Sequence, residues 1–246
     1  MDRFSILVGD ITRSDAEAIV NAANPTLLGG AGVDGAIHAA AGPELLAECR
    51  TLGGCERGRA KLTAGYRLRA RYVIHTPGPV WQGGEQGEAA LLASCYRNSL
   101  ALAEEQGCAT VAFSSISTGV YRFPLDRAAA IAVREIWSFL RTARRVREVT
   151  MVAFNLETEG AYRRAWAAFT LEVPPGRYRH FKGGEYQVLA TARHSETLEP
   201  MVVYRALYGD GGLWTRPADM WSQRVEREDY EGPRFILEEP MEGETL

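Results

Sequence analysis

The sequence is poor in lysine, cysteine and histidine. Only Lys61 and Lys182 are lysine, and the formal net charge of −3 comes with no dense basic patch, which argues against a nucleic-acid partner. The four cysteines show no Cys-x-x-Cys spacing, and with the four histidines they form no zinc pattern. The sequence therefore predicts no metal site, and no cofactor is expected.

Long apolar runs and targeting segments are also missing. No apolar run approaches the roughly 20 residues that span a bilayer, so no membrane partner is expected. The first ten residues, MDRFSILVGD, lack a charged segment followed by a long apolar one, which argues against a secretory signal. We therefore expect a cytoplasmic protein with free thiols.

The 246 residues, 46% hydrophobic and 24% charged, have the composition of a globular protein, and their pattern divides near Pro174-Pro175. Before that point, strand-like runs alternate with helical patterns; the strands are expected at 4–8, 72–76, 110–114 and 149–154, and the helices at 88–106, 125–141 and 157–169. This alternation predicts an α/β sheet with helices on both faces. After it, short strand-like runs separated by glycine-rich turns predict a small β-rich domain. We expect domains at 1–172 and 176–240.

Two glycine-rich loops, each after a strand and before a helix, are the main chemical feature. The first contains Gly29, Gly30 and Gly32 and leads into a helix near Val33, and the second spans 114–124. Open backbone N–H groups and a helix N-terminus favour an anion such as a diphosphate. Neither loop has the lysine of a Walker motif or the GxGxxG pattern of a dinucleotide fold. A kinase or redox interpretation therefore loses its main support.

Four blocks resemble a macrodomain over about residues 1–170: Gly9–Thr12, Asn21–Asn24, Gly29–His38 and Ile116–Pro124. The stretch Val33–His38 is closest to the MacroD-type branch, which removes ADP-ribose from acidic side chains and deacetylates O-acetyl-ADP-ribose. The resemblance implies a three-layer α/β/α fold around a mixed central sheet. It also implies ADP-ribose bound across the carboxyl edge of that sheet.

The same resemblance assigns roles to individual residues. Asn24 and Asp34 would be catalytic: Asn24 would hold the distal ribose, and Asp34 would orient or activate a water. Asp10 and Ile11 would bind the adenine, and Phe154 would flank it. The other expected ligand-binding residues lie around the two loops: Ala23, Gly30, Gly32, Val33, Ser117, Thr118, Gly119, Val120 and Tyr121.

Ordinary structural roles compete with these assignments. Asp10 and Asp34 are typical helix-capping residues, and Asn24 is a typical turn residue before Pro25. Phe154 and Tyr121 fit core packing, and His38 fits helix packing better than proton transfer. Two positions depart from the family pattern, because Ala31 and Arg122 stand where glycine is usual. Ala31 is tolerated if its φ is negative, and Arg122 either pairs with a phosphate or points to solvent.

The second part resembles a small bacterial family of unknown function, through stretches that include Tyr178–Gly183, His194–Thr197 and Val202–Gly209. His194-Ser195 lacks the geometry of a nucleophile–base pair, so a polar turn is expected there. The segment is rich in aromatic residues, which build its core or bind a partner. Residues 171–246 hold 9 basic and 14 acidic residues, whereas residues 1–170 hold 19 and 17. This acidic balance argues against nucleic-acid binding by the second part.

The function expected from the sequence is a macrodomain hydrolase. It would bind ADP-ribose and cleave ADP-ribosyl esters, by removing mono-ADP-ribose from Asp or Glu or by deacetylating O-acetyl-ADP-ribose. Its partners would be ADP-ribose, ADP-ribosylated proteins or O-acetyl-ADP-ribose. The alternative is a non-catalytic module that reads ADP-ribose without turnover.

Overall fold

The computed structural model describes residues 3–241, so the first two residues of the predicted first domain lie outside it. The chain forms two units, Met1–Trp166 and Ala167–Leu246. The division lies inside the helix α5 (Leu156–Phe169), ahead of Pro174-Pro175. The domain limits 1–172 and 176–240 stay a prediction. No helix in residues 3–241 is long and apolar enough to cross a membrane.

A six-stranded mixed sheet forms the centre of the first unit. Its order is β1 (Phe4–Val8), β6 (Glu148–Ala153), β5 (Thr110–Phe113), β2 (Ala18–Ala23), β4 (Tyr72–Pro77) and β3 (Lys61–Ala64). The first five strands are parallel, and β3 runs antiparallel to β4. Parallel strands bring their carboxyl ends to one edge, so the segments that follow β2, β5 and β6 meet there. This mixed sheet confirms the expected fold.

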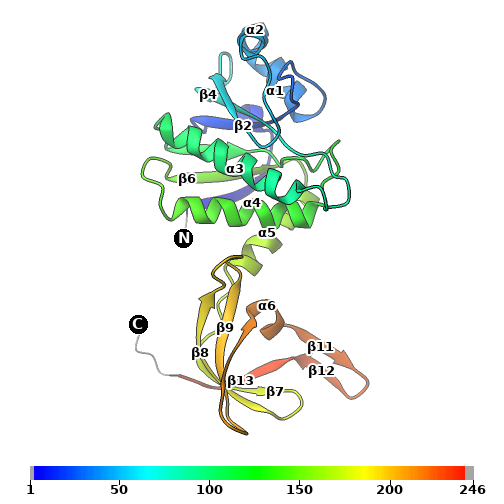
Figure 1. The fold of residues 1–246 in the computed structure, drawn as a ribbon, viewed down its shortest axis with the longest axis vertical. Helices are drawn as coiled ribbons and strands as arrows, with labels where there is room; N and C mark the ends of the chain where they lie inside the picture. Colours follow the sequence, from blue (N-terminus) through cyan, green and yellow to red (C-terminus); the bar gives the residue numbers. More distant parts are fainter. Residues whose placement is uncertain (1–2, 242–246) are drawn as a thin grey trace. The chain divides into compact units, whose positions relative to one another are not determined.

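Helices cover both faces of this sheet because its strands are apolar on both sides. Ile19 and Ala23 of β2 pack into a core with Ile37 of α1 (Val33–Ala41) and Leu45 of α2 (Pro43–Thr51). On the other face, Phe113 of β5 contacts Tyr96 of α3, with ring centroids 5.1 Å apart. Figure 1 shows α3 (Glu88–Glu105) and α4 (Leu125–Leu140) side by side on this face. The three-layer α/β/α arrangement is therefore confirmed.

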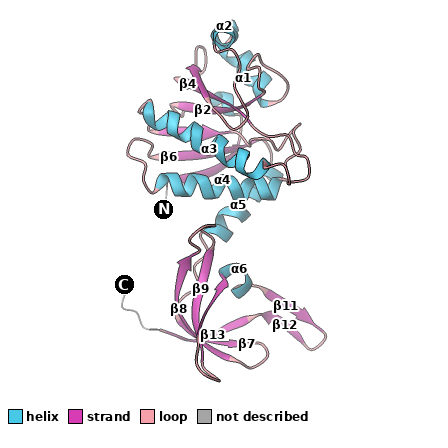
Figure 2. Ribbon diagram, in the orientation of Figure 1, coloured by secondary structure: helices cyan, strands magenta, loops and turns pink. Residues whose placement is uncertain are grey.

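The second unit is β-rich, as expected (Figure 2). Five antiparallel strands form its main sheet, in the order β10 (Leu213–Pro217), β9 (Pro200–Ala206), β8 (Glu185–Arg193), β7 (Gly176–His180) and β13 (Phe235–Pro240). A hairpin of β11 (Arg224–Arg227) and β12 (Tyr230–Pro233) and a short helix, α6 (Ala218–Trp221), complete it. Trp221 of α6 stacks on Phe235 with ring centroids 3.9 Å apart, and this pair lies in the core of the unit.

Candidate functional site

Two adjoining cavities lie where the loops after β2, β5 and β6 meet. The first cavity, about 250 Å³, lies between the Gly30–Asp34 segment and the Ser115–Tyr121 loop. The second, about 610 Å³, extends from there to the segments that follow β1 and β6. Gly32, Val33 and Ser115 border both cavities, so the two form one continuous groove. Its size suits a ligand with several groups in a row.

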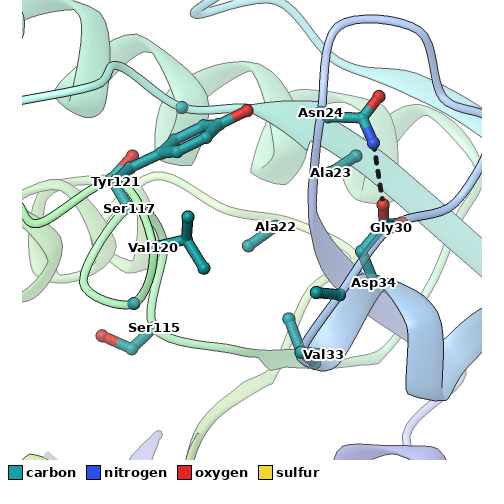
Figure 3. A pocket seen from close by; sticks show the side chains of 14 residues that line it. Ala22, Ala23, Asn24, Gly30, Val33, Asp34, Ser115, Ser117, Val120 and Tyr121 are labelled. Atoms are coloured by element: carbon teal, nitrogen blue, oxygen red, sulfur yellow. Dashed lines mark hydrogen bonds between the residues drawn. The ribbon is translucent and has the colours of Figure 1, made fainter.

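The structure brings all the site residues predicted from the sequence to this groove. Ten of them border the first cavity: Ala23, Asn24, Gly30, Gly32, Val33, Asp34, Ser117, Gly119, Val120 and Tyr121. Figure 3 shows Tyr121 and Val120 on one side of that cavity, opposite Asn24 and Asp34. Asp10, Ile11, Thr118 and Phe154 border the second cavity.

Sequence reasoning missed several groove residues, among them Ala22, Gly78, Ser115, Ala36 and Thr158. Gly78 follows β4, whose carboxyl end lies at the same edge of the sheet. A Cβ on Gly78 would lie 2.1 Å from Ser117 Oγ, so only glycine lets the two segments approach this closely. The sequence signal that could have located Gly78 was its position directly after a buried strand.

The first glycine loop packs tightly against the helix that it precedes. A Cβ on Gly35 would lie 2.3 Å from the carbonyl oxygen of Gly30, which requires glycine in this turn of α1. Gly32, the N-cap of α1, has φ of 65° and no side chain caps the helix. The first N–H groups of α1 are therefore left for a ligand, and the helix dipole favours an anion there.

The Asp34 carboxylate is the best-supported chemical group of the first cavity. Only 3% of the residue is exposed, and Asn21 Nδ2 donates to Oδ1 at 2.7 Å, while Asn24 Nδ2 donates to Oδ2 at 3.3 Å. The Asp34 side chain caps no helix, so the interpretation of Asp34 as a helix-capping residue is wrong. Burial raises the pKa of Asp34, whereas the Asn21 hydrogen bond and His38 oppose the shift. A carboxylate oxygen has two lone-pair directions, so each oxygen keeps one for a water or a ligand.

Asn24 uses its whole amide within the protein. Nδ2 donates to Gly29 O at 2.8 Å and to Asp34 Oδ2, and Oδ1 accepts from the N–H and hydroxyl of Thr26. These bonds form a turn around Pro25, as the structural alternative expected. An asparagine side chain offers four hydrogen-bonding positions, and here all four are occupied. In this arrangement Asn24 orients Asp34 and the first glycine loop.

A buried polar chain that the sequence did not reveal supports Asp34 from behind. Asn21 Nδ2 also lies 3.2 Å from His75 Nδ1, and His75 Nε2 lies 2.9 Å from Thr63 Oγ1. Burial is the main cause that lowers the pKa of His75 to about 3, so the ring is neutral at pH 7. Because the Asn21 amide donates, His75 Nδ1 accepts and the proton lies on Nε2, which donates to Thr63. The chain therefore fixes the direction of the Asn21 amide.

His38, Cys49 and His75 are the described residues whose ligand atoms lie close enough to suggest a metal ion, all within 4.8 Å of one another. The hydrogen-bond chain already uses His75 Nε2 as a donor, so that atom is not free to bind a metal. Burial raises the pKa of the Cys49 thiol to about 11, which disfavours the thiolate form. His38 Nε2 lies 3.6 Å from Asp34 Oδ1, too far for a hydrogen bond. The cluster therefore fits a packed core better than a metal site.

The far end of the groove combines a carboxylate with an exposed aromatic ring. Asp10 Oδ1 accepts from the N–H and hydroxyl of Thr12 at the start of η1 (Ile11–Arg13), so Asp10 is a cap, as the structural alternative expected. These bonds lower the pKa of Asp10 and leave Oδ2 unused. Phe154 is 89% exposed beside the same cavity, so its interpretation as a core aromatic is wrong.

Comparison with known proteins agrees with this geometry. Residues 20–132 match the Macro domain family, and the chain is 57% identical over 171 residues to a macro domain-containing protein of Lactiplantibacillus plantarum, covering 69% of this chain and 99% of that protein. The chain belongs to the macro domain family. Residues 176–237 match a second family, a protein of unknown function named DUF1653.

Other relatives of this macro domain carry functional names. A Klebsiella pneumoniae protein named O-acetyl-ADP-ribose deacetylase is 49% identical over 168 residues, covering 67% of this chain and 96% of that protein. A mutant of the Oceanobacillus iheyensis macrodomain, solved with ADPR, is 43% identical, with a TM-score of 0.63, and covers 65% of this chain and 89% of that one. The Trypanosoma brucei macrodomain in complex with ADP-ribose is 42% identical, also with a TM-score of 0.63, and covers 66% and 68%.

The two departures from the macro domain pattern have different consequences. Ala31 does not have a positive φ, so its methyl group is tolerated at this position, as the sequence analysis required. Arg122 has φ of 56°, a region that favours glycine, and its N–H donates to Gly119 O at 2.9 Å. The Arg122 side chain is exposed and borders neither cavity of the groove. Of the two alternatives for Arg122, the structure therefore favours a side chain that points to solvent.

Proposed function

We propose that the macro domain binds ADP-ribose along the groove and hydrolyses ADP-ribosyl esters. The observation that carries this proposal is the buried Asp34 carboxylate, held by Asn21 and Asn24 and bordering the cavity between the two glycine loops. The relatives named as deacetylases, and the neighbours solved with ADP-ribose, support the same assignment.

The groove supplies suitable groups for each part of ADP-ribose. The N-terminus of α1 and the Ser117–Tyr121 loop would hold the diphosphate through backbone N–H groups. At the far end, Asp10 Oδ2 and the Ile11 N–H would bind the adenine edge, and Phe154 would stack on its face. The distal ribose would then lie in the first cavity, near Asp34.

The proposed reaction is hydrolysis of an ester between the distal ribose and a carboxylic acid. Asp34 would accept a hydrogen bond from a water and orient it toward the ester carbonyl carbon. The water oxygen bonds to that carbon and the bond from the carbon to the ribose oxygen breaks. The acid and ADP-ribose leave, and the ribose oxygen takes the proton. Partial proton transfer to Asp34 would make the attacking water a better nucleophile. Burial favours this proton transfer because it raises the pKa of Asp34.

Two substrate classes carry such an ester: proteins with mono-ADP-ribosylated Asp or Glu, and O-acetyl-ADP-ribose. Release of ADP-ribose from both substrates tests the proposal, with Asp34→Asn as the main variant. We expect Asp34→Asn to bind ADP-ribose within a few-fold of wild type and to lose about 10²–10⁴ in rate, the usual share of a positioned acid–base group. Asp126→Asn is the matched control, because Asp126 is exposed and pairs with Arg164.

Two outcomes would contradict parts of this proposal. Full hydrolysis by Asp34→Asn would remove the role of Asp34. Stoichiometric binding of ADP-ribosylated protein by wild type without release would instead make the macro domain a reader module.

A further inference from the structure

The second unit gathers cations and aromatic rings on one side of its main sheet. Arg216 lies over the rings of Tyr204 and Phe235, at 6.0 and 5.6 Å from the ring centroids. Arg227 and Lys182 lie over Phe181, at 5.3 and 5.8 Å. We call these three cations, together with Arg234 and His180, the basic-aromatic cluster.

His180 joins the two halves of this cluster. Its ring centroid lies 4.8 Å from that of Phe235, beneath Arg216, and 4.5 Å from that of Phe181, beneath Arg227. Burial, and then the charges of Arg234, Arg216, Lys182 and Arg227, lower the pKa of His180. All four cations are therefore near enough to act on one ring.

The cations of the cluster lack acidic partners, although the unit is rich in carboxylates. Arg177, Arg179 and Arg224 of the same unit each pair with a glutamate. In residues 3–241, by contrast, no carboxylate oxygen lies within 4.0 Å of the charged groups of Arg216, Arg227, Arg234 or Lys182. Arg234 Nε is also buried without a hydrogen-bond partner. Four neighbouring like charges repel one another, and a bound anion would offset that repulsion.

An exposed aromatic surface continues from the cluster. Trp214 and Arg216 are two residues apart on β10, so their side chains share one face of the sheet. Trp214 lies opposite Tyr204 of β9, the ring beneath Arg216, and is 59% exposed. Trp214 and Arg216 therefore place an exposed ring and a cation on the same face of the sheet.

We propose that the basic-aromatic cluster and Trp214 bind a small phosphorylated compound with a planar ring, of the nucleotide class. The cations would hold the phosphate and Trp214 would stack on the base. The small size follows from charge: residues 171–246 hold 14 acidic residues against 9 basic ones, so a long polyanion would meet repulsion outside the cluster.

Calorimetric titration of the full chain with UMP, uridine and inorganic phosphate tests this site. UMP avoids the adenine contacts proposed for the macro domain, so its failure to bind would leave the proposed function unaffected. We expect UMP to bind at one site, with affinity that decreases as salt increases. Arg216→Gln and Arg227→Gln should each weaken the binding of UMP at least tenfold. Arg224→Gln, the matched control, should change the affinity for UMP less than twofold.

Trp214→Ala separates the two parts of the ligand. This substitution should weaken the binding of UMP several-fold and leave the affinity for inorganic phosphate unchanged. Thermal melting identifies any variant that fails to fold. If Arg216→Gln fails to fold, Arg227→Gln carries the test, because Arg227 is exposed. Absence of UMP binding, or UMP binding that neither arginine variant weakens, would overturn the proposal. Oligouridylate binding at least a hundredfold tighter than UMP would overturn it too, because the ligand would then be a nucleic acid.

Discussion

Asn21 donates to Asp34 Oδ1 at 2.7 Å from the same amide nitrogen that contacts His75 Nδ1 at 3.2 Å. One buried amide therefore links the carboxylate of the proposed active site to a neutral histidine in the core. The Asn21 amide donates in both directions, to Asp34 Oδ1 and to His75 Nδ1, so His75 carries its proton on Nε2 and donates it to Thr63 Oγ1. The orientation of Asp34 thus depends on residues that do not border the groove.

Asn21→Ala tests this dependence. It removes the donor to Asp34 Oδ1 and leaves His75 Nδ1 unpaired, so the free energy of unfolding should fall by about 1–3 kcal/mol. Ester hydrolysis should fall at least tenfold, because Asp34 loses its shorter hydrogen bond. The control is Asn98→Ala, which removes a bond to Gly58 O away from the groove. Urea unfolding and ADP-ribose release are the measurements, and equal hydrolysis by the two variants would contradict the positioning role.

The pH dependence of stability tests the neutral state of His75. Its pKa is about 3 in the folded protein and 6.5 without burial, so the unfolded chain takes up a proton that the folded protein does not. The contribution to stability is complete above pH 6.5 and is lost as pH falls from 6.5 toward 3. The slope is at most about 1.4 kcal/mol per pH unit. His75→Asn should lack this component, measured as the difference between the two urea-unfolding curves from pH 7 to pH 4.5. Parallel curves would show that the pKa of His75 is the same in the folded protein as in the unfolded chain.

Phe154→Ala tests the adenine end of the groove. An exposed ring contributes little to folding, so the melting temperature should stay within a degree or two of wild type (roughly what a surface substitution allows). Loss of base stacking, worth about 1–3 kcal/mol, should weaken ADP-ribose binding by about 5-fold to 150-fold. Leu156→Ala is the matched control, since Leu156 is 75% exposed and borders neither cavity. Calorimetric titration with equal affinity for both variants would remove Phe154 from the site.

Gly78→Ala tests the contact between the segment after β4 and the second glycine loop. The added Cβ would lie 2.1 Å from Ser117 Oγ and 2.7 Å from Ile116 Cγ2, so the loop must move. We expect weaker ADP-ribose binding and a lower free energy of unfolding. Gly160→Ala is the control, because Gly160 lies in α5, borders neither cavity, and a Cβ there would meet only the end of the Arg164 side chain, at 3.2 Å. If Gly78→Ala bound ADP-ribose as tightly as Gly160→Ala, the loop position would not matter for binding.

The sequence was sufficient for features that depend on local pattern. Apolar runs at 4–8 and 110–114 became β1 and β5, because buried parallel strands must be apolar on both faces. The two glycine loops and Asp34 were identifiable because tight backbone turns and helix starts leave recognisable residue types. Asp10 and Asn24 also took the capping and turn roles that their residue types favour.

Other features depended on contacts between distant segments, which local pattern does not encode. Asn21, Thr63 and His75 are far apart in sequence and meet only because β2, β4 and β3 are neighbours in the sheet. The exposure of Phe154 and the gathering of Arg216 and Arg227 around His180 were likewise decided by tertiary packing. The sequence alone determined that this chain pairs an α/β domain carrying two glycine-rich loops with a β-rich one. Only the tertiary structure decided which polar groups are buried together, because burial and hydrogen bonding arise from the whole fold.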